Sequence, residues 1–134
     1  MATAATFVWL GMVLAISFLE APLKFRAPGV TTVIGLGIGR LVFRALNVVE
    51  LVLLVAVIVG VVVGGASIGP AVVIGALVVL LLAQLALVRP GLNRRSDRVL
   101  AGETGSRSRL HVVYIALEAV KVAALLVLGV LLLA

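Results

Sequence analysis

The sequence predicts an all-α integral membrane protein, with four antiparallel transmembrane helices forming one up-and-down bundle over residues 1–134. Three observations predict this fold class. Hydrophobic residues make up 64% of the 134 positions and charged residues only 12%, which is more apolar surface than a water-soluble chain of this length can bury. Four apolar runs fill the chain, each near or above the roughly 18 residues that a membrane crossing needs. The charged residues gather mainly in the connections between these runs.

The first two expected spans cover residues 4–22 and 41–63. A secretory signal peptide would begin with a basic region, whereas the first cation here is Lys24, so we expect a retained helix. The connection over 23–40 is interrupted by Pro28 and Gly29. Beyond that break, Thr31 or Thr32 is suited to cap an interfacial helical segment that precedes the second span.

The last two expected spans cover residues 71–88 and 110–133. The uncharged turn "GGASIGP" places Pro70 in the first turn of the third span, a position that proline tolerates. Pro90 and Gly91 end that span, and the loop over 89–109 follows. Gly60 and Gly64 form a G-x-x-x-G pattern, which lets helices approach closely, either within the bundle or between subunits.

The distribution of cations predicts the orientation of the chain. Basic residues lie in the loops 23–40 and 89–109, whereas the N-terminal tail, the second turn and the C-terminal end carry no charged side chain. The positive-inside rule therefore places both loops in the cytoplasm and both termini outside, in a bacterial-type inner membrane. The net charge of +6 suits anionic lipid headgroups, with Arg94, Arg95 and Arg98 as contacts, and not nucleic acid. Phe7 and Trp9 are expected near the outer interface.

Polar and ionisable residues inside or beside the spans predict a buried polar seam. At 100° per residue, the members on the second span fall within roughly 120° of one another, and those on the fourth form a narrow stripe. An unpaired charge at the bilayer centre costs at least about 2.5–3.5 kcal/mol, so we expect these groups to face other helices and to pair. The seam consists of Glu20, Arg40, Arg44, Asn47, Glu50, His111, Tyr114, Glu118 and Lys121, with Ser17 on the stripe of the first span and Gln84 near the inner end of the third.

Several functions fit such a seam. It can support helix association or the passage of a proton or small solute, in a homo-oligomer or as an accessory subunit of a larger membrane complex. No catalytic residue is assigned, because the sequence shows no hydrolytic carboxylate pair, Ser–His–Asp set or phosphate-binding loop. With no cysteine, one histidine and two methionines, neither a metal site nor a cofactor is expected.

The segments "WLGMVLAISFLEAPLKF", "GRLVFRALN" and "RLHVVYIALEAVKVAALLVLG" resemble small four-helix membrane proteins of the DUF4149 or TMEM205-like kind. This resemblance spans nearly the whole chain and implies a small membrane protein of the same four-helix layout. The animal members of that group are linked to metal-drug export. We do not extend that role to this chain, which lacks the cysteines and methionines that would support metal handling.

The second span also resembles part of the MAPEG family of glutathione-dependent membrane enzymes. The family pattern R-A-x-x-N-x-x-E corresponds here to R-A-x-N-x-x-E, formed by Arg44, Ala45, Asn47 and Glu50. One residue fewer separates the arginine from the asparagine, which rotates the arginine by about 100° around a helix. The resemblance implies, as an alternative, glutathione-dependent catalysis in the membrane.

Overall fold

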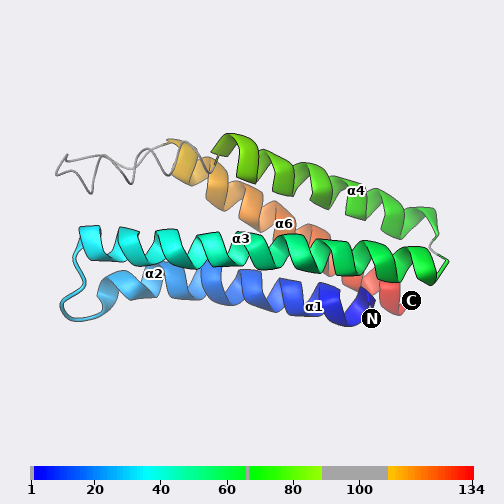
Figure 1. Ribbon diagram of the computed structural model, residues 1–134, viewed down its shortest axis with the longest axis horizontal. Helices are drawn as coiled ribbons and strands as arrows, with labels where there is room; N and C mark the ends of the chain where they lie inside the picture. Colours follow the sequence, from blue (N-terminus) through cyan, green and yellow to red (C-terminus); the bar gives the residue numbers. More distant parts are fainter. Residues whose placement is uncertain (1, 66, 89–108) are drawn as a thin grey trace.

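The computed structural model describes residues 2–65, 67–88 and 109–134, and these residues are helical with short turns and no strand (Figure 1). Four helical stretches are long and apolar enough to cross a membrane, namely Ala2–Arg26, Thr32–Val63, Ile68–Ala86 and Val112–Leu133. Each overlaps one of the spans expected from the sequence. Nearly all of the expected loop over 89–109, with Arg94, Arg95 and Arg98, lies outside the described residues.

The first stretch changes its hydrogen-bond pattern along its length. It begins as α1 (Ala2–Val13), widens into the π-helix η1 (Leu14–Glu20), and ends in α2 (Ala21–Leu23) and the 3-10 turn η2 (Lys24–Arg26). A π-helix bonds each N–H to the carbonyl five residues earlier, so it changes the direction of the side chains that follow. Beyond it, Gly29 adopts a φ of 82°, in the left-handed region that glycine occupies readily.

The second stretch is the single helix α3 (Thr32–Val63). Thr31 caps it, because its hydroxyl oxygen accepts a hydrogen bond from the backbone N–H of Ile34 at 3.2 Å. The sequence predicts a helix capped by Thr31 or Thr32 ahead of the second span at Leu41, and the structure joins the two as one unbroken helix. The glycines of this segment are packed, because Gly35 lies against the Phe25 ring and Gly39 against the Lys24 side chain. The 32 residues of α3 measure about 48 Å, which exceeds a hydrocarbon core of roughly 30 Å.

The third stretch consists of α4 (Ile68–Ala83) and a second π-helix, η3 (Gln84–Val88), and the fourth is α6 (Arg109–Leu133). Pro70 lies in the first turn of α4, as the sequence predicts. Helix α1 packs against both α3 and α6, and α4 packs mainly against α6. Helices α3 and α4 are consecutive in the chain, yet they touch only sparsely. In Figure 1 they separate as they extend away from the turn that joins them.

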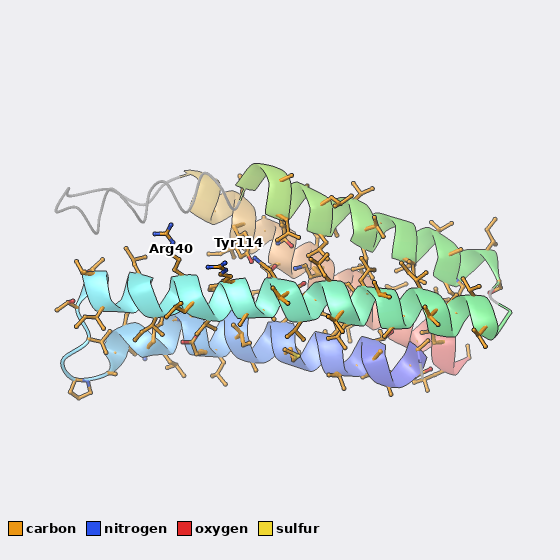
Figure 2. All side chains as sticks on the ribbon, viewed as in Figure 1. Arg40 and Tyr114 are labelled. Atoms are coloured by element: carbon orange, nitrogen blue, oxygen red, sulfur yellow. The ribbon has the colours of Figure 1, made fainter. Side chains whose placement is uncertain are left out.

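The interior is apolar over most of its length. The buried core includes Trp9, Leu10, Val13, Leu54, Val57, Leu77, Leu81, Leu125 and Leu128. Many other large apolar side chains project from the outer faces of all the helices (Figure 2). An apolar exterior of this kind suits a helical protein solvated by lipid, where the helices satisfy their own backbone hydrogen bonds.

Close packing of α1 on α3 depends on Gly60. A Cβ atom at this position would lie 3.0 Å from the backbone nitrogen of Ala2 and 2.9 Å from its Cβ. We therefore expect Gly60→Ala to lower the free energy of unfolding by roughly 1–3 kcal/mol, because an added methyl overpacks the contact. Gly75→Ala on α4 is the matched control, since nothing lies within 4 Å of a Cβ there. Unfolding in detergent, followed by circular dichroism, measures the effect. Equal losses of unfolding free energy in the two variants would contradict this packing.

Candidate functional site

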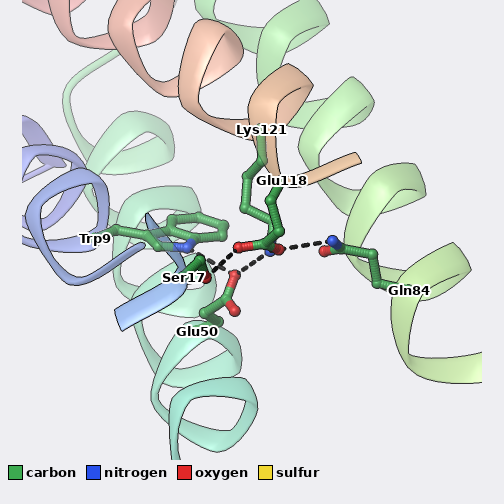
Figure 3. A network of polar contacts seen from close by, with 6 residues as sticks. All are labelled: Trp9, Ser17, Glu50, Gln84, Glu118 and Lys121. Atoms are coloured by element: carbon green, nitrogen blue, oxygen red, sulfur yellow. Dashed lines mark hydrogen bonds and ion pairs between the residues drawn. The ribbon is translucent and has the colours of Figure 1, made fainter. Parts of the chain in front are cut away.

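Six polar or amphipathic side chains meet in the interior of the protein (Figure 3). All four membrane-length stretches contribute to this group, which we name the buried cluster. Five of its members are nearly or fully buried, and Ser17 is partly buried. The members are Trp9 of α1, Ser17 of η1, Glu50 of α3, Gln84 of η3, and Glu118 and Lys121 of α6.

Lys121 lies between the two carboxylates of the cluster. Its ammonium nitrogen is 2.7 Å from Oε2 of Glu50 and 2.8 Å from Oε1 of Glu118. Glu118 stands one helical turn before Lys121 on α6, whereas Glu50 reaches it from α3. The side chains of Lys121 and Glu50 are 0% exposed. Two acids from different helices thus share one base away from any solvent.

Glu118 is the more completely hydrogen-bonded of the two carboxylates. Besides Lys121, its Oε1 accepts a hydrogen bond from the amide nitrogen of Gln84 at 2.6 Å. Its Oε2 accepts one from the hydroxyl of Ser17, also at 2.6 Å. Three donors from three helical stretches thus converge on the Glu118 carboxylate.

Glu50 is hydrogen-bonded through only one oxygen. Its Oε2 accepts from Lys121 and from the indole nitrogen of Trp9, the latter at 2.9 Å. Its Oε1 is buried and has no hydrogen-bond partner among the described residues. The cluster therefore holds two unequal carboxylates, one with both oxygens engaged and one with a buried oxygen that still has acceptor capacity.

The two π-helices supply the neutral donors to Glu118. Ser17 lies within η1 and Gln84 is the first residue of η3, and both donate to Glu118. π-helical turns are rare and are frequently found at functional sites. Two separate helices thus present a polar group to the same carboxylate.

The charges of the cluster do not balance. Two carboxylates face one ammonium, so the fully ionised cluster carries one net negative charge. Water cannot screen that charge in a low-dielectric interior, where charges interact strongly and desolvation is costly. The geometry thus combines a net negative charge with an oxygen of Glu50 to which no donor in the described part of the chain is bonded.

Glu20 and Lys24 form a separate pair, with their charged atoms 3.9 Å apart. The Lys24 ammonium lies 5.4 Å and 5.7 Å from the ring centroids of Phe25 and Phe43, within range of cation–π attraction. Tyr114 is buried, and its ring meets Phe43 edge to face at 5.8 Å. The sequence places Lys24 among the loop cations and on one stripe with Glu20. In the structure its side chain lies against α3, over Gly39.

Arg40, Arg44 and Asn47 line a groove of about 460 Å³ beside α3, which includes Leu85 of η3 in its wall. Both arginines are exposed and Asn47 is mostly buried. The predicted seam is therefore divided among three places: the buried cluster, the Glu20–Lys24 pair and this groove. The side chain of His111 lies outside the described residues.

Trp9 is the one member of the buried cluster that the sequence did not predict beside the seam. It was expected near the outer interface, yet it is 0% exposed and its indole N–H donates to Glu50. A buried tryptophan usually finds a hydrogen-bond acceptor, which is the chemical signal for this contact. The sequence places Ser17 and Gln84 beside the seam, and the structure brings both to Glu118.

Within the described residues, no group of three or more His, Cys, Asp or Glu side chains is placed to hold a metal ion. Comparison with family models, curated proteins and solved structures finds no match for this chain. The resemblances to the DUF4149 or TMEM205-like proteins and to the MAPEG enzymes thus stay predictions. In the segment that resembles MAPEG, Arg44 and Asn47 line the groove, whereas Glu50 joins the buried cluster.

Proposed function

We propose that this protein is a four-span integral membrane protein whose buried cluster binds and releases one proton, in support of the passage of a proton or small solute. The observation that carries the proposal is the sharing of Lys121 by two buried carboxylates. One bound proton makes the cluster electrically neutral. Ionisable groups inside a membrane are energetically costly and therefore rare, and those that occur commonly line routes for protons, ions or solutes.

We place the proton on Glu50. Both oxygens of Glu118 already accept hydrogen bonds from described residues. Oε1 of Glu50 has no partner among the described residues, so a proton can bind there without displacing a donor. Release of that proton leaves both Glu50 and Glu118 ionised beside the single ammonium of Lys121. The cluster then carries one net negative charge, and Glu50 attracts Lys121 more strongly.

The same cluster supports helix association, because it joins residues from all four membrane-length stretches. Proton binding at Glu50 would therefore alter the contact between α3 and α6, which is made by Glu50 and Lys121. We propose an up-and-down arrangement with the basic ends in the cytoplasm and both termini outside, in a bacterial inner membrane. Lys24, Arg26, Arg40 and Arg44 near the turn between the first two stretches support this orientation.

Proton flux into proteoliposomes tests the proposal. The protein is reconstituted around a trapped pH-sensitive dye, and a potassium diffusion potential drives proton entry. We expect flux above that of protein-free vesicles, and we expect Glu50→Gln to abolish the increase, because glutamine accepts the same hydrogen bonds but exchanges no proton. Glu20→Gln is the matched control, since it removes a carboxylate outside the cluster.

Infrared difference spectra between acidic and alkaline buffer give a second readout. We expect a protonated-carboxyl band that disappears in Glu50→Gln and persists in Glu20→Gln. Unchanged flux in a folded Glu50→Gln protein, as judged by circular dichroism and size-exclusion chromatography, would contradict the assignment. A wild-type flux equal to that of empty vesicles would contradict proton passage. Helix association would then be the only proposed role of the cluster.

A further inference from the structure

The groove beside α3 changes from polar to apolar along its length. Arg40 and Arg44 stand toward the Thr32 end of the helix, and Asn47 follows one turn further on. Val48, Leu51 and Leu85 line the deeper part. Because i, i+3 and i+4 positions share a helix face, these α3 residues form one continuous wall.

The length of this wall matches one leaflet of a bilayer. Eleven residues separate Arg40 from Leu51, which is a rise of about 16 Å along the helix. Half of a hydrocarbon core of roughly 30 Å is about 15 Å. Leu51 stands beside Glu50 of the buried cluster, whereas Arg40 stands nearer the basic turn. In a bilayer, the polar end of the groove would therefore lie at the level of the headgroups, and the apolar end would lie in the hydrocarbon core.

We infer that this groove binds an anionic phospholipid, with its phosphate against Arg40 and Arg44 and an acyl chain along Val48, Leu51 and Leu85. Guanidinium groups bind phosphate through charge-assisted and often bidentate hydrogen bonds. Basic pockets between membrane helices are a recurring place for anionic headgroups. Asn47 lies between the two regions and supplies an amide donor at the level of the ester groups that join head and tail.

The sparse contact between α3 and α4 supports this occupant. These helices are joined by a short turn, but they separate toward the groove (Figure 1), and the space there measures about 460 Å³. Arg40 projects from α3 toward the side on which α4 lies (Figure 2). A bound lipid would fill the gap between consecutive helices and neutralise cations held beside the apolar wall.

Native mass spectrometry of the detergent-purified protein tests the inference directly. The probes are phosphatidylglycerol, phosphatidylcholine with the same acyl chains, and glycerol phosphate together with inorganic phosphate as tail-free anions. We expect phosphatidylglycerol to be retained in preference to phosphatidylcholine. The double change Arg40→Gln and Arg44→Gln should weaken that retention roughly ten-fold or more, since each surface cation contributes about 1 kcal/mol toward an anionic lipid.

Two further variants separate a built groove from general charge attraction. Arg26→Gln removes an exposed cation outside the groove, and it should retain phosphatidylglycerol. Val48→Trp fills the groove without changing the charge and should reduce retention, whereas Val62→Trp on an exposed face near the far end of α3 should not. Equal retention of both lipids, or equal losses in Arg26→Gln and the double variant, would overturn the inference. Competition by tail-free phosphate as strong as by lipid would also overturn it, because the groove would then bind an anion alone.

Discussion

Lys121→Met is expected to lower the free energy of unfolding by roughly 3–5 kcal/mol, the range found when one partner of a buried ion pair is removed. The change leaves Glu50 and Glu118 facing each other without their shared cation. Methionine retains most of the volume of the lysine stem, so the loss would report the charge and not a cavity. Denaturation with sodium dodecyl sulfate from a mild detergent, followed by circular dichroism, measures the effect.

Glu50→Gln should cost far less than Lys121→Met. It leaves the charge-balanced pair of Lys121 and Glu118 at 2.8 Å, and the glutamine oxygen can still accept from Trp9. This asymmetry between the acid and the base follows from two carboxylates sharing one ammonium. Equal losses of unfolding free energy in the two variants would contradict that sharing, because an isolated pair of one acid and one base loses the same ion pair whichever partner is removed.

Glu118→Leu is the second change with a large expected effect. It removes the acceptor used by Ser17, Gln84 and Lys121. A buried donor left without a partner costs about 1–3 kcal/mol. Two orphaned neutral donors should thus lower the free energy of unfolding by roughly 2–6 kcal/mol, while Lys121 keeps its bond to Glu50.

Glu118→Gln is the matched control, because it keeps an oxygen acceptor of nearly the same shape. We expect it to recover most of the stability lost in Glu118→Leu, measured in the same denaturation assay. Similar losses in both variants would assign the role of Glu118 to its charge alone. That result would contradict the contribution of the Ser17 and Gln84 hydrogen bonds.

Helical periodicity and depth in the bilayer are sufficient to bring Glu50, Glu118 and Lys121 together from the sequence alone. The cost of an unpaired charge in lipid fixes the side of each helix that such residues face. It does not fix the partner, because Arg40 and Arg44 share the polar stripe of Glu50 by helical spacing, although both arginines are exposed in the structure. Arg40 and Arg44 were grouped with the acids, whereas the structure gives both acids of the cluster to Lys121 and places the arginines along the groove.

The hydrogen-bond partners were harder to predict than the buried faces. Helical spacing places Ser17 on the face of Val13 and Gln84 on the face of Leu81, but it does not show that both donate to Glu118. Trp9 was assigned by the tendency of tryptophan to lie at membrane interfaces, which its buried bond to Glu50 overrides. Glycines usually weaken helices, but the helix that the sequence predicts from Thr31 or Thr32 continues through Gly35 and Gly39, which are packed against the preceding segment.

The proposed proton site and the proposed lipid groove share α3. Glu50 faces the buried cluster, and its neighbours Asn47, Val48 and Leu51 line the groove. Each of the two proposals still has its own test, since the flux assay uses Glu50→Gln and the lipid assay uses Arg40, Arg44 and Val48.

A double-mutant cycle on Glu50 and Lys121 tests the central arrangement most directly. Unfolding free energies are measured for the wild type, Glu50→Gln, Lys121→Met and the double variant, with Glu20→Gln and Lys24→Met as a control cycle on the boundary pair. We expect the double variant to recover part of the loss in Lys121→Met, with a coupling of about 1 kcal/mol or more, and a weaker coupling in the control cycle. Strictly additive losses at Glu50 and Lys121 would show that the two side chains do not interact, and would contradict the buried cluster.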